Sequence, residues 1–543
     1  IDALIKLDRV VDAQSVLFEA KGKGAKGKAF DQLEQRVNAP NEVSIDPPQE
    51  QLQPIINLYI QGQLQQALSH TTKMLEQFPD SVVLYNISGA ANAGLGQLDT
   101  AIDSYKQALK IKPDFADVYN NMGLVLHEKG NSEAAIESYK QALKIKPDYA
   151  DAYYNMGITL NVIGNLESTI DSYKKAIKIK SNHAEAYNNM GAALNDNGDF
   201  ESAIDSCRQA IQIKPDFAEA YNNMGLTLQN KGDLEAAVDS YKQALKIKSD
   251  YDAATANLVS LLTSYTPQKE NLNLIITDNE AIRKIEIPCK SSHIISDEQI
   301  VNLFLESSSS LSGNSLAVRT ELSQTYRRNS VDLNCKRHKS IFNEHDIIPE
   351  FCFGCYKVQV EPRSIIELIK LYVVFDQLHL KENNTRKCMV ELRPEISGFY
   401  KGLIYCSGLK QANEIAEYLD TVVKQNIGLG LPAKVKRGCS EYSSAFPDYK
   451  EINNSGPQLM NYIEEWKVIE EDHDRLNPMH PNENVMESLS GLNLNDVLIM
   501  QKWVDYAKGI GDPKADLINE TTVYYQEIHD KAKARLKSFQ FIR

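Results

Sequence analysis

The chain contains 543 residues, of which 42% are hydrophobic, and it carries a formal net charge of −14 at pH 7 with an isoelectric point of about 5.4. This length predicts several folded domains. The acidic balance argues against a dedicated nucleic-acid-binding protein, so we expect no nucleic acid as a partner. No apolar run approaches the roughly 20 residues that a membrane-spanning helix needs, so we expect no membrane span.

Residues 1–47 are interpreted as the end of an earlier repeat followed by a linker. A Lys/Gly-rich stretch at 21–28 interrupts the first part, and Asn and Pro residues mark the linker at 38–48. The chain begins with Ile1 and shows no signal peptide. We therefore interpret it as a fragment of a longer cytoplasmic protein. If its N-terminus is truncated, a targeting signal could have been lost with the missing residues.

Residues 48–264 contain an internal repeat of 34 residues. A glycine recurs at this period, a Tyr precedes it by four residues, and a second glycine follows it by seven. The second glycine lets the chain leave a helix in the left-handed conformation, and proline ends the next helix in most repeats. The repeated residues are Gly89, Gly123, Gly157, Gly191 and Gly225; Tyr85, Tyr119, Tyr153, Tyr187 and Tyr221; and Gly96, Gly130, Gly164, Gly198 and Gly232.

This period and pattern resemble the tetratricopeptide repeat (TPR), a helix–turn–helix unit that stacks into a superhelix. The resemblance implies an α-solenoid of helix pairs over residues 48–264, closed by a capping helix at 252–264. It also implies a protein or peptide ligand in the concave groove. Cys207 occupies the slot that holds Tyr105, Tyr139, Tyr173 and Tyr241 in the other repeats, so we expect it to be buried and unreactive.

An asparagine stands two residues before four of the five first glycines, and once more in the capping helix: Asn121, Asn155, Asn189, Asn223 and Asn257. An amide side chain both donates and accepts hydrogen bonds, so such a ladder could hold the backbone of an extended peptide without reading its side chains. The pattern resembles the asparagine ladder of O-linked N-acetylglucosamine transferases. The alternative is that these amides bond within the superhelix and support its packing. Acidic residues in the first turn of four of the first helices, Asp117, Asp151, Glu185 and Glu219, disfavour an acidic ligand.

Residues 265–330 form a junction without legible chemistry. A helix near 294–305 is expected, and the serine run Ser307–Ser312 is expected to be a loop.

Cysteine is enriched after the junction. Four residues, Cys335, His338, Cys352 and Cys355, follow the pattern C-x2-H-x13-C-x2-C, which matches the spacing of structural zinc sites. His345 is a substitute ligand in this hypothesis. Two alternatives stay open: four reduced residues without a metal, and a redox or iron–sulfur site.

Residues 331–450 are expected to combine this zinc knuckle with a ferredoxin-like α+β domain. The order βαββαβ is predicted from strands at 356–361, 388–392, 402–406 and 433–439, and from helices at 363–378 and 409–424. Residues 451–543 are expected to form a helical C-terminal region, with helices at 459–474, 494–508 and 519–539.

Two groups of polar residues at strand ends are candidates for chemistry. They are Glu391, Arg393 and Glu395 after the second strand, and Lys436, Arg437, Cys439 and Glu441 near the fourth. If both strands are central, these groups could converge at one end of the sheet. The alternative is a set of ordinary surface ion pairs. No phosphate-binding loop, nucleophile elbow or nucleotide-binding glycine pattern is present.

We therefore expect a scaffold that holds an extended peptide and is attached to a zinc-containing α+β domain of unknown activity. The repeats resemble the long arrays that many bacteria fuse to transferase domains. The alternative function is a protein-modifying transferase whose repeats select substrates and whose active site lies in residues 331–450. A deep pocket where Glu391, Arg437 and Cys439 converge would favour the enzyme.

Overall fold

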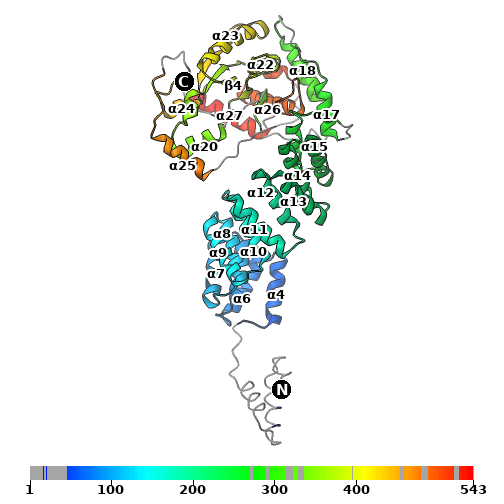
Figure 1. Ribbon diagram of the computed structural model, residues 1–543, viewed down its shortest axis with the longest axis vertical. Coiled ribbons are helices and arrows are strands. Elements are labelled where there is room, and N and C mark those ends of the chain that lie inside the picture. Colours follow the sequence, from blue (N-terminus) through cyan, green and yellow to red (C-terminus); the bar gives the residue numbers. More distant parts are fainter. Residues whose placement is uncertain are drawn as a thin grey trace. The chain divides into compact units, whose positions relative to one another are not determined.

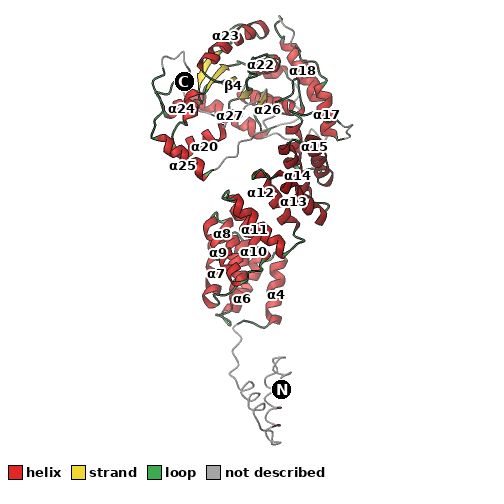
Figure 2. Cartoon of the chain, in the orientation of Figure 1, coloured by secondary structure: helices red, strands yellow, loops and turns green. Residues whose placement is uncertain are grey.

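The computed structural model of the chain is shown in Figure 1, and its helices and strands in Figure 2. It describes Val16, Ala20 and residues 46–268, 273–288, 293–311, 322–327, 335–393, 396–452, 458–477, 487–518 and 525–541. The interpretation of residues 1–45 and the position of Glu395 lie outside the described residues. The chain divides into two compact units, residues 1–181 and 182–543, and this division falls inside the predicted repeat array.

The first unit consists of antiparallel helix pairs, each packed on its neighbours in the sequence. The helices are α4 (Gln49–Ile60), α5 (Leu64–Leu75), α6 (Val82–Gly94), α7 (Leu98–Ile111), α8 (Ala116–Glu128), α9 (Ser132–Ile145), α10 (Ala150–Val162) and α11 (Leu166–Ile179). Gly96 and Gly130 have φ angles of 74° and 82°, as expected for the glycine that ends the first helix of a pair. The helical repeat predicted from the glycine period is confirmed.

The first glycine of each repeat is required by close packing. A Cβ atom at Gly123 would lie 2.5 Å from the ring of Tyr139, and the same contact recurs between Gly89 and Tyr105. Tyrosine fills the space that the absent side chain leaves, so each helix pair is held at one separation. In the second unit, Cys207 takes the place of Tyr opposite Gly191 and is fully buried, as predicted, and burial raises the pKa of its thiol to about 12.

The second unit continues the repeats and then changes architecture. Its first helices are α12 (Ala184–Asp196), α13 (Phe200–Ile213), α14 (Ala218–Lys231), α15 (Leu234–Ile247) and the capping helix α16 (Asp252–Leu261). Ser249 replaces proline after α15, yet α15 ends at the same repeat position as the helices that proline follows. Proline is therefore not needed to end the helix here. The capping helix shares a hydrophobic core with the C-terminal part of the unit.

The junction contains more regular structure than expected. Helices α17 (Leu274–Arg283) and α18 (Asp297–Ser309) lie in it, and the expectation of a loop for the serine run is wrong for Ser307–Ser309, which end α18. Ser296 and Gln299 form a capping box at the start of α18. The hydroxyl of Ser307 donates to the carbonyl of Phe304, so serine satisfies its own polar group inside the helix.

A five-stranded antiparallel sheet forms the centre of the C-terminal part. Its strands are β1 (Gln324–Arg327), β2 (Tyr356–Val360), β3 (Arg386–Val390), β4 (Tyr400–Cys406) and β5 (Lys434–Arg437), in the order β1-β3-β4-β2-β5. The four predicted strands correspond to β2–β5. Strand β1 was not predicted, because its four residues are too short to show a pattern.

Helices α22 (Ile365–Gln377) and α23 (Leu409–Asn426) pack on the sheet. A side chain at Gly402 of β4 would collide with Leu371 and Phe375 of α22, which shows how closely this helix approaches the strand. Helix α26 (Leu494–Ile510) packs on α22 and is buried over most of its length. It begins at a capping box of Asn493 and Asp496 and ends at Gly511, whose φ is 75°.

A buried ion-pair network joins β1, α22 and α26. The guanidinium of Arg327 donates to Asp376 at 2.8 Å and to Asp496 at 2.6 Å, and all three side chains are almost inaccessible to solvent. Arg327 also donates to the hydroxyl of Tyr372. Removing one member would leave a buried charge without compensation, so the network is expected to fix β1 to the helices.

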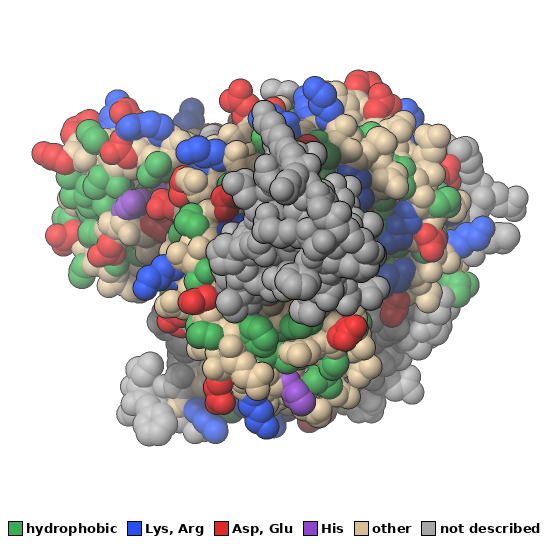
Figure 3. Space-filling view, turned by 90° about the horizontal axis from the view of Figure 1, so that it is seen from below, with side chains coloured by type: hydrophobic (Ala, Val, Ile, Leu, Met, Phe, Trp, Pro, Cys, Tyr) green, Lys and Arg blue, Asp and Glu red, His purple; other side chains and the backbone are tan. Residues whose placement is uncertain are grey.

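The remaining described helices surround this core. They are α20 (Cys335–His345), α21 (Glu350–Gly354), α24 (Ser440–Ala445), α25 (Trp466–Leu476), the 3-10 helix η2 (Pro513–Leu517) and α27 (Gln526–Phe541). Among the described helices, none has the length and apolar character needed to cross a membrane. Acidic and basic side chains are interspersed on the described surface seen in Figure 3.

Candidate functional site

The asparagine ladder forms hydrogen bonds between successive repeats. In four cases the amide nitrogen of a ladder residue donates to the side-chain oxygen of an asparagine 35 residues earlier. The pairs are Asn121 to Asn86 and Asn155 to Asn120, both at 3.0 Å, and Asn223 to Asn188 and Asn257 to Asn222, both at 2.9 Å. The amide nitrogens therefore act within the superhelix, as the packing alternative requires.

The amide oxygens of the same four ladder residues are differently placed. Each side chain is half-buried, and within the described residues no hydrogen bond to its Oδ1 atom is found. None of these oxygens is among the fully buried polar atoms that lack a partner. In each of these four residues the amide nitrogen thus donates to the preceding repeat, and the amide oxygen remains an accessible hydrogen-bond acceptor. Peptide binding at these positions stays a prediction.

Asn189 departs from the other ladder residues. The position 35 residues before it is Tyr154 and not an asparagine, and the Oδ1 atom of Asn189 accepts from its neighbour Asn188 at 3.2 Å. The second row of acceptors, Asn86, Asn120, Asn188 and Asn222, could have been paired with the ladder from the sequence, because the two rows share the 34-residue period.

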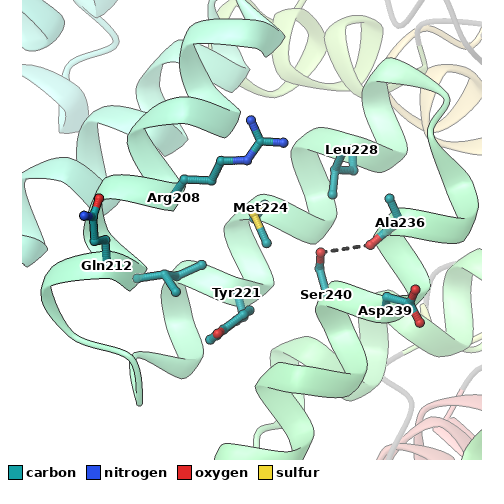
Figure 4. A pocket seen from close by; sticks show the side chains of 9 residues that line it. Arg208, Gln212, Tyr221, Met224, Leu228, Ala236, Asp239 and Ser240 are labelled. Carbon is teal, nitrogen blue, oxygen red and sulfur yellow. Dashed lines mark hydrogen bonds between the residues drawn. The ribbon is translucent and has the colours of Figure 1, made fainter.

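A shallow pocket of about 410 Å³ lies among α13, α14 and α15 (Figure 4). Helix α14 contributes Tyr221, Met224 and Leu228 to its wall. At 3.6 residues per turn, these positions lie on the face of α14 opposite to Asn223. The pocket is therefore separate from the ladder surface.

The predicted zinc ligands lie on neighbouring elements. Cys335 and His338 are on α20, Cys352 is in α21, and Cys355 directly precedes β2. His338 stacks on Phe351, and the Cys352 thiol contacts the hydroxyl of Tyr442 at 3.4 Å. Burial raises the pKa values of Cys352 and Cys355, so neither is an activated thiolate in this state.

Glu344, His345 and His473 form a group of possible metal ligands whose ligand atoms lie within 4.8 Å of one another. Within the described residues, no other group of three or more such side chains meets this distance. The four predicted ligands are not brought together in this way. Zinc at Cys335, His338, Cys352 and Cys355 stays a prediction that rests on spacing.

The polar residues at the strand ends converge in part. The guanidinium of Arg393 binds Glu391, at 2.7 Å, and also Glu441, and the ammonium of Lys401 binds Glu391 at 3.0 Å. Burial alone would raise the pKa of Glu391, but Arg393 and Lys401 outweigh this effect and lower it to about 2. Glu391 is therefore a carboxylate that fixes the surrounding cations.

Arg437 does not join that group. Its guanidinium donates to the carbonyl of Phe353 and to the side chain of Gln458, and it lies over the rings of Phe353 and Tyr449. These contacts hold β5 to an aromatic cluster. The predicted convergence of Glu391, Arg437 and Cys439 is therefore not found.

The face of the sheet opposite to α22 carries lysines on four adjacent strands: Lys357 on β2, Lys387 on β3, Lys401 on β4, and Lys434 and Lys436 on β5. Lys401 and Lys436 have carboxylate partners in Glu391 and Glu451. Within the described residues, Lys357 and Lys387 have none. Sequence reasoning missed this row, although its residues alternate along the strands as side chains on one face must.

Cys439 lies at the end of this row. The ammonium of Lys357 donates to the carbonyl of Gly438 at 3.0 Å and contacts the Cys439 sulfur at 3.5 Å. Burial would raise the pKa of the Cys439 thiol, but the positive charges of Lys357, Lys436 and Lys387 outweigh it and lower the pKa. Burial and the charge of Lys357 lower the pKa of Lys387 to about 8. In this part of the chain a thiol with a lowered pKa lies beside lysines that have no carboxylate partner among the described residues.

Known repeat proteins match the first part of the chain. The family described as TPR repeat matches residues 93–130, 123–160 and 163–198, and the family described as Tetratricopeptide repeat matches 184–217 and 218–251. No curated protein matches the chain.

Several solved structures of repeat proteins are similar. MamA is 31% identical, over 30% of this chain and 94% of that chain, with a TM-score of 0.29. YrrB, a TPR protein with an unusual peptide-binding site, is 22% identical over 34% of this chain and 96% of that chain, with a TM-score of 0.31. PilF of Pseudomonas aeruginosa is 17% identical over 38% of this chain and 94% of that chain, with a TM-score of 0.35. Each of these three leaves more than half of this chain uncovered.

Proposed function

Because this chain is a tetratricopeptide repeat protein and its repeats make it a protein-interaction scaffold, we propose that the repeats hold the backbone of an extended peptide. The observation that carries this proposal is the arrangement of four of the five ladder amides, Asn121, Asn155, Asn223 and Asn257. In these four the nitrogen donates to the preceding repeat, and the oxygen stays accessible at the same repeat position.

The proposed contact runs from a backbone N–H group of the peptide to the Oδ1 atom of a ladder asparagine. The hydrogen bond to the preceding repeat orients the amide before the peptide arrives, which lowers the entropy cost of binding. Backbone contacts of this kind do not depend on the ligand's side chains. Acidic residues in the first turns, Asp117, Asp151, Glu185 and Glu219, would select against strongly acidic peptides.

Two matched triple variants test the proposal. Asn155, Asn223 and Asn257 changed to Ala would lose both the inter-repeat bonds and the accessible oxygens. Asn120, Asn188 and Asn222 changed to Ala would lose the same three inter-repeat bonds and keep the oxygens. The probe is an immobilised array of random-sequence peptides, with binding constants measured for the best binders.

We expect at least about tenfold weaker peptide binding for the first triple variant, since each lost hydrogen bond contributes about 0.5–1.5 kcal/mol. The second variant should lose similar thermal stability, and its binding should weaken less than that of the first variant, because it loses the orienting bonds but keeps the oxygens. Equal binding losses in the two variants would show that the asparagines act through packing alone.

For the C-terminal part we infer a ferredoxin-like unit with additions. The order of elements β2-α22-β3-β4-α23-β5 and the antiparallel strand order β5-β2-β4-β3 support this class, with β1 and α26 as additions. This fold class does not itself indicate a reaction. A structural zinc at the Cys335, His338, Cys352 and Cys355 set, the bacterial origin and the cytoplasmic location remain proposals made from the sequence.

One observation favours the second candidate function, a protein-modifying transferase with its site in residues 331–450. Cys439 would be the nucleophile, because the neighbouring ammonium groups favour its thiolate. Lys357 and Lys387, which lack carboxylate partners among the described residues, would hold an anionic group of the donor. Modification of Cys439 by a thiol-reactive reagent at neutral pH, and protection by a bound donor, would support this function.

A further inference from the structure

Helices α20 and α25 bring three metal-ligand groups together outside the sites considered above. The Nε2 atom of His345 and the Nδ1 atom of His473 are 3.3 Å apart, and the Oε2 atom of Glu344 lies 3.4 Å from that Nδ1 atom. The same carboxylate oxygen lies 4.0 Å from His345. The side chain of His473 is 4% exposed, whereas those of His345 and Glu344 are 37% and 52% exposed.

Hydrogen bonding alone accounts poorly for this arrangement. The Nδ1 atom of His473 carries at most one proton, so it cannot donate to both His345 and Glu344. If it accepts from His345 instead, its lone pair faces that nitrogen, and neither histidine donates to the Oε2 atom of Glu344, which then has solvent as its donor. A cation between the three atoms would satisfy all of them at once.

The distances also fit a tetrahedral ion. Zn²⁺ binds histidine nitrogen and carboxylate oxygen at about 2.0–2.2 Å, which places neighbouring ligand atoms of a tetrahedron about 3.3–3.6 Å apart. Two of the three separations lie at this value, and the third, between the adjacent residues Glu344 and His345, closes with a small side-chain rotation.

Other contacts hold the two helices in place independently of an ion. Arg337 of α20 pairs with Asp474 at 2.6 Å and with Glu470 at 3.1 Å, both on α25. Glu470 also accepts from the backbone N–H of Glu350 and the hydroxyl of Tyr462. These contacts flank His473 in the sequence, so they hold the part of α25 that carries it against α20 without a metal.

We propose that Glu344, His345 and His473 bind a divalent transition-metal ion, with Zn²⁺ as the fitting example. Three protein ligands leave a fourth position, and the exposure of Glu344 and His345 opens it to solvent. Water would fill that position in the free protein, and a carboxylate or imidazole of a bound protein would be able to replace it. The set consists of nitrogen and oxygen ligands, which separates it from the cysteine-containing set predicted from spacing.

The experiment measures Zn²⁺ binding by the full chain after removal of metals with a chelator, using a competing chromogenic chelator. His345→Ala and Glu344→Ala change exposed side chains and should leave the fold intact, which circular dichroism would check. Each should weaken Zn²⁺ binding by more than the roughly 10–100-fold that loss of an outer hydrogen-bond partner costs. The matched control is Asn343→Ala, an exposed change on the same helix next to Glu344, which should bind Zn²⁺ like the unchanged protein.

Substitution with Co²⁺ gives a second readout, which reports the type of ligand atom. A site made of histidine and carboxylate lacks the charge-transfer absorption of a thiolate–cobalt bond. No Zn²⁺ binding by the unchanged chain would overturn the proposal. So would a thiolate band that disappears in Cys335→Ser and persists in His345→Ala, and this result would support the cysteine set instead.

Discussion

The repeats and the C-terminal sheet are stabilised over different distances along the sequence. In the repeats, helices pack on their sequence neighbours, and the ladder amides bond to asparagines 35 residues away. In the C-terminal part, Arg327 bonds to Asp496 across 169 residues, and β2 pairs with β5 across about 80. A repeat is therefore a local unit that is copied, whereas the sheet depends on contacts that no short segment contains. This difference predicts where a single substitution acts and how far its effect extends.

The largest effect is expected at the buried ion pairs of Arg327. The change Arg327→Met leaves Asp376 and Asp496 buried without a cation, and should lower the free energy of unfolding of the second unit by about 3–5 kcal/mol. Arg363→Met removes an exposed ion pair with Glu367 and should change stability by less than about 0.5 kcal/mol. Urea unfolding monitored by tryptophan fluorescence checks both, since Trp466 and Trp503 lie in the second unit. Similar free energies of unfolding for the two variants would contradict the stabilising role of the long-range ion pairs of Arg327.

The second effect is a pH dependence from Glu391. Its folded pKa of about 2 lies below the unfolded value of about 4.5, so the charged form is stabilised by folding. The contribution, about 3 kcal/mol, is fully present above pH 4.5 and is lost as the pH falls towards 2. The free energy of unfolding at pH 6 and pH 2.5 should therefore differ less in Glu391→Gln than in the unchanged protein. Equal differences in the two proteins would show that the carboxylate gains nothing from Arg393 and Lys401.

A smaller and local effect is expected in the repeats. Gly123→Ala places a methyl group 2.5 Å from the ring of Tyr139, and this overpacking should lower stability by about 1–3 kcal/mol. Gly354→Ala is the control, because no heavy atom lies within 4 Å of the new Cβ atom. Hydrogen exchange should show the change in the first unit and leave the amides of β2–β5 unaffected. Faster exchange of the sheet amides in Gly123→Ala would show that a substitution in the repeats also destabilises the sheet, contrary to this prediction.

The smallest expected effect is a change in the reactivity of a cysteine thiol. Cys439 has a lowered pKa and Cys207 one raised to about 12, so alkylation near neutral pH should modify Cys439 well before Cys207. Lys357→Met should raise the pH at which Cys439 reacts, because it removes the nearest positive charge. Lys434→Met, on the same face of the sheet, should have no such effect. Mass spectrometry of tryptic peptides would follow both cysteines, and unchanged reactivity in Lys357→Met would remove the support for a nucleophilic Cys439.

Much of the repeat region could be predicted because its determinants are periodic. The positions of Gly123 and Cys207 in the packing follow from spacing alone, since each repeat places equivalent residues in equivalent contacts. The ladder positions could also be identified from the sequence, but the orientation of each side-chain amide could not. The sequence does not show which end of an amide meets the preceding repeat, and that choice determines which atom is left for a ligand.

The C-terminal part was predicted at the level of segments. Alternation along residues 356–361 indicated β2, and the apolar residues of α22 indicated a buried helix. The pairing order of the strands, the burial of Arg327 against Asp376 and Asp496, and the meeting of Lys357 with Cys439 were not predictable, because each joins segments with no shared pattern. The spacing of Cys335, His338, Cys352 and Cys355 suggested a metal site, whereas the ligand atoms that lie together belong to Glu344, His345 and His473.

By itself, the sequence determined the repeat period, the helices that the period encodes and the identity of the strands. These are properties of local spacing, where hydrophobic periodicity and glycine conformations act within one or two elements. Tertiary structure alone decided which charges are buried together, which amide atoms remain accessible and which histidines share one carboxylate. The physical reason is that electrostatic and ligand-binding interactions act between side chains over a few ångströms in space, and only the folded chain brings such side chains within that range.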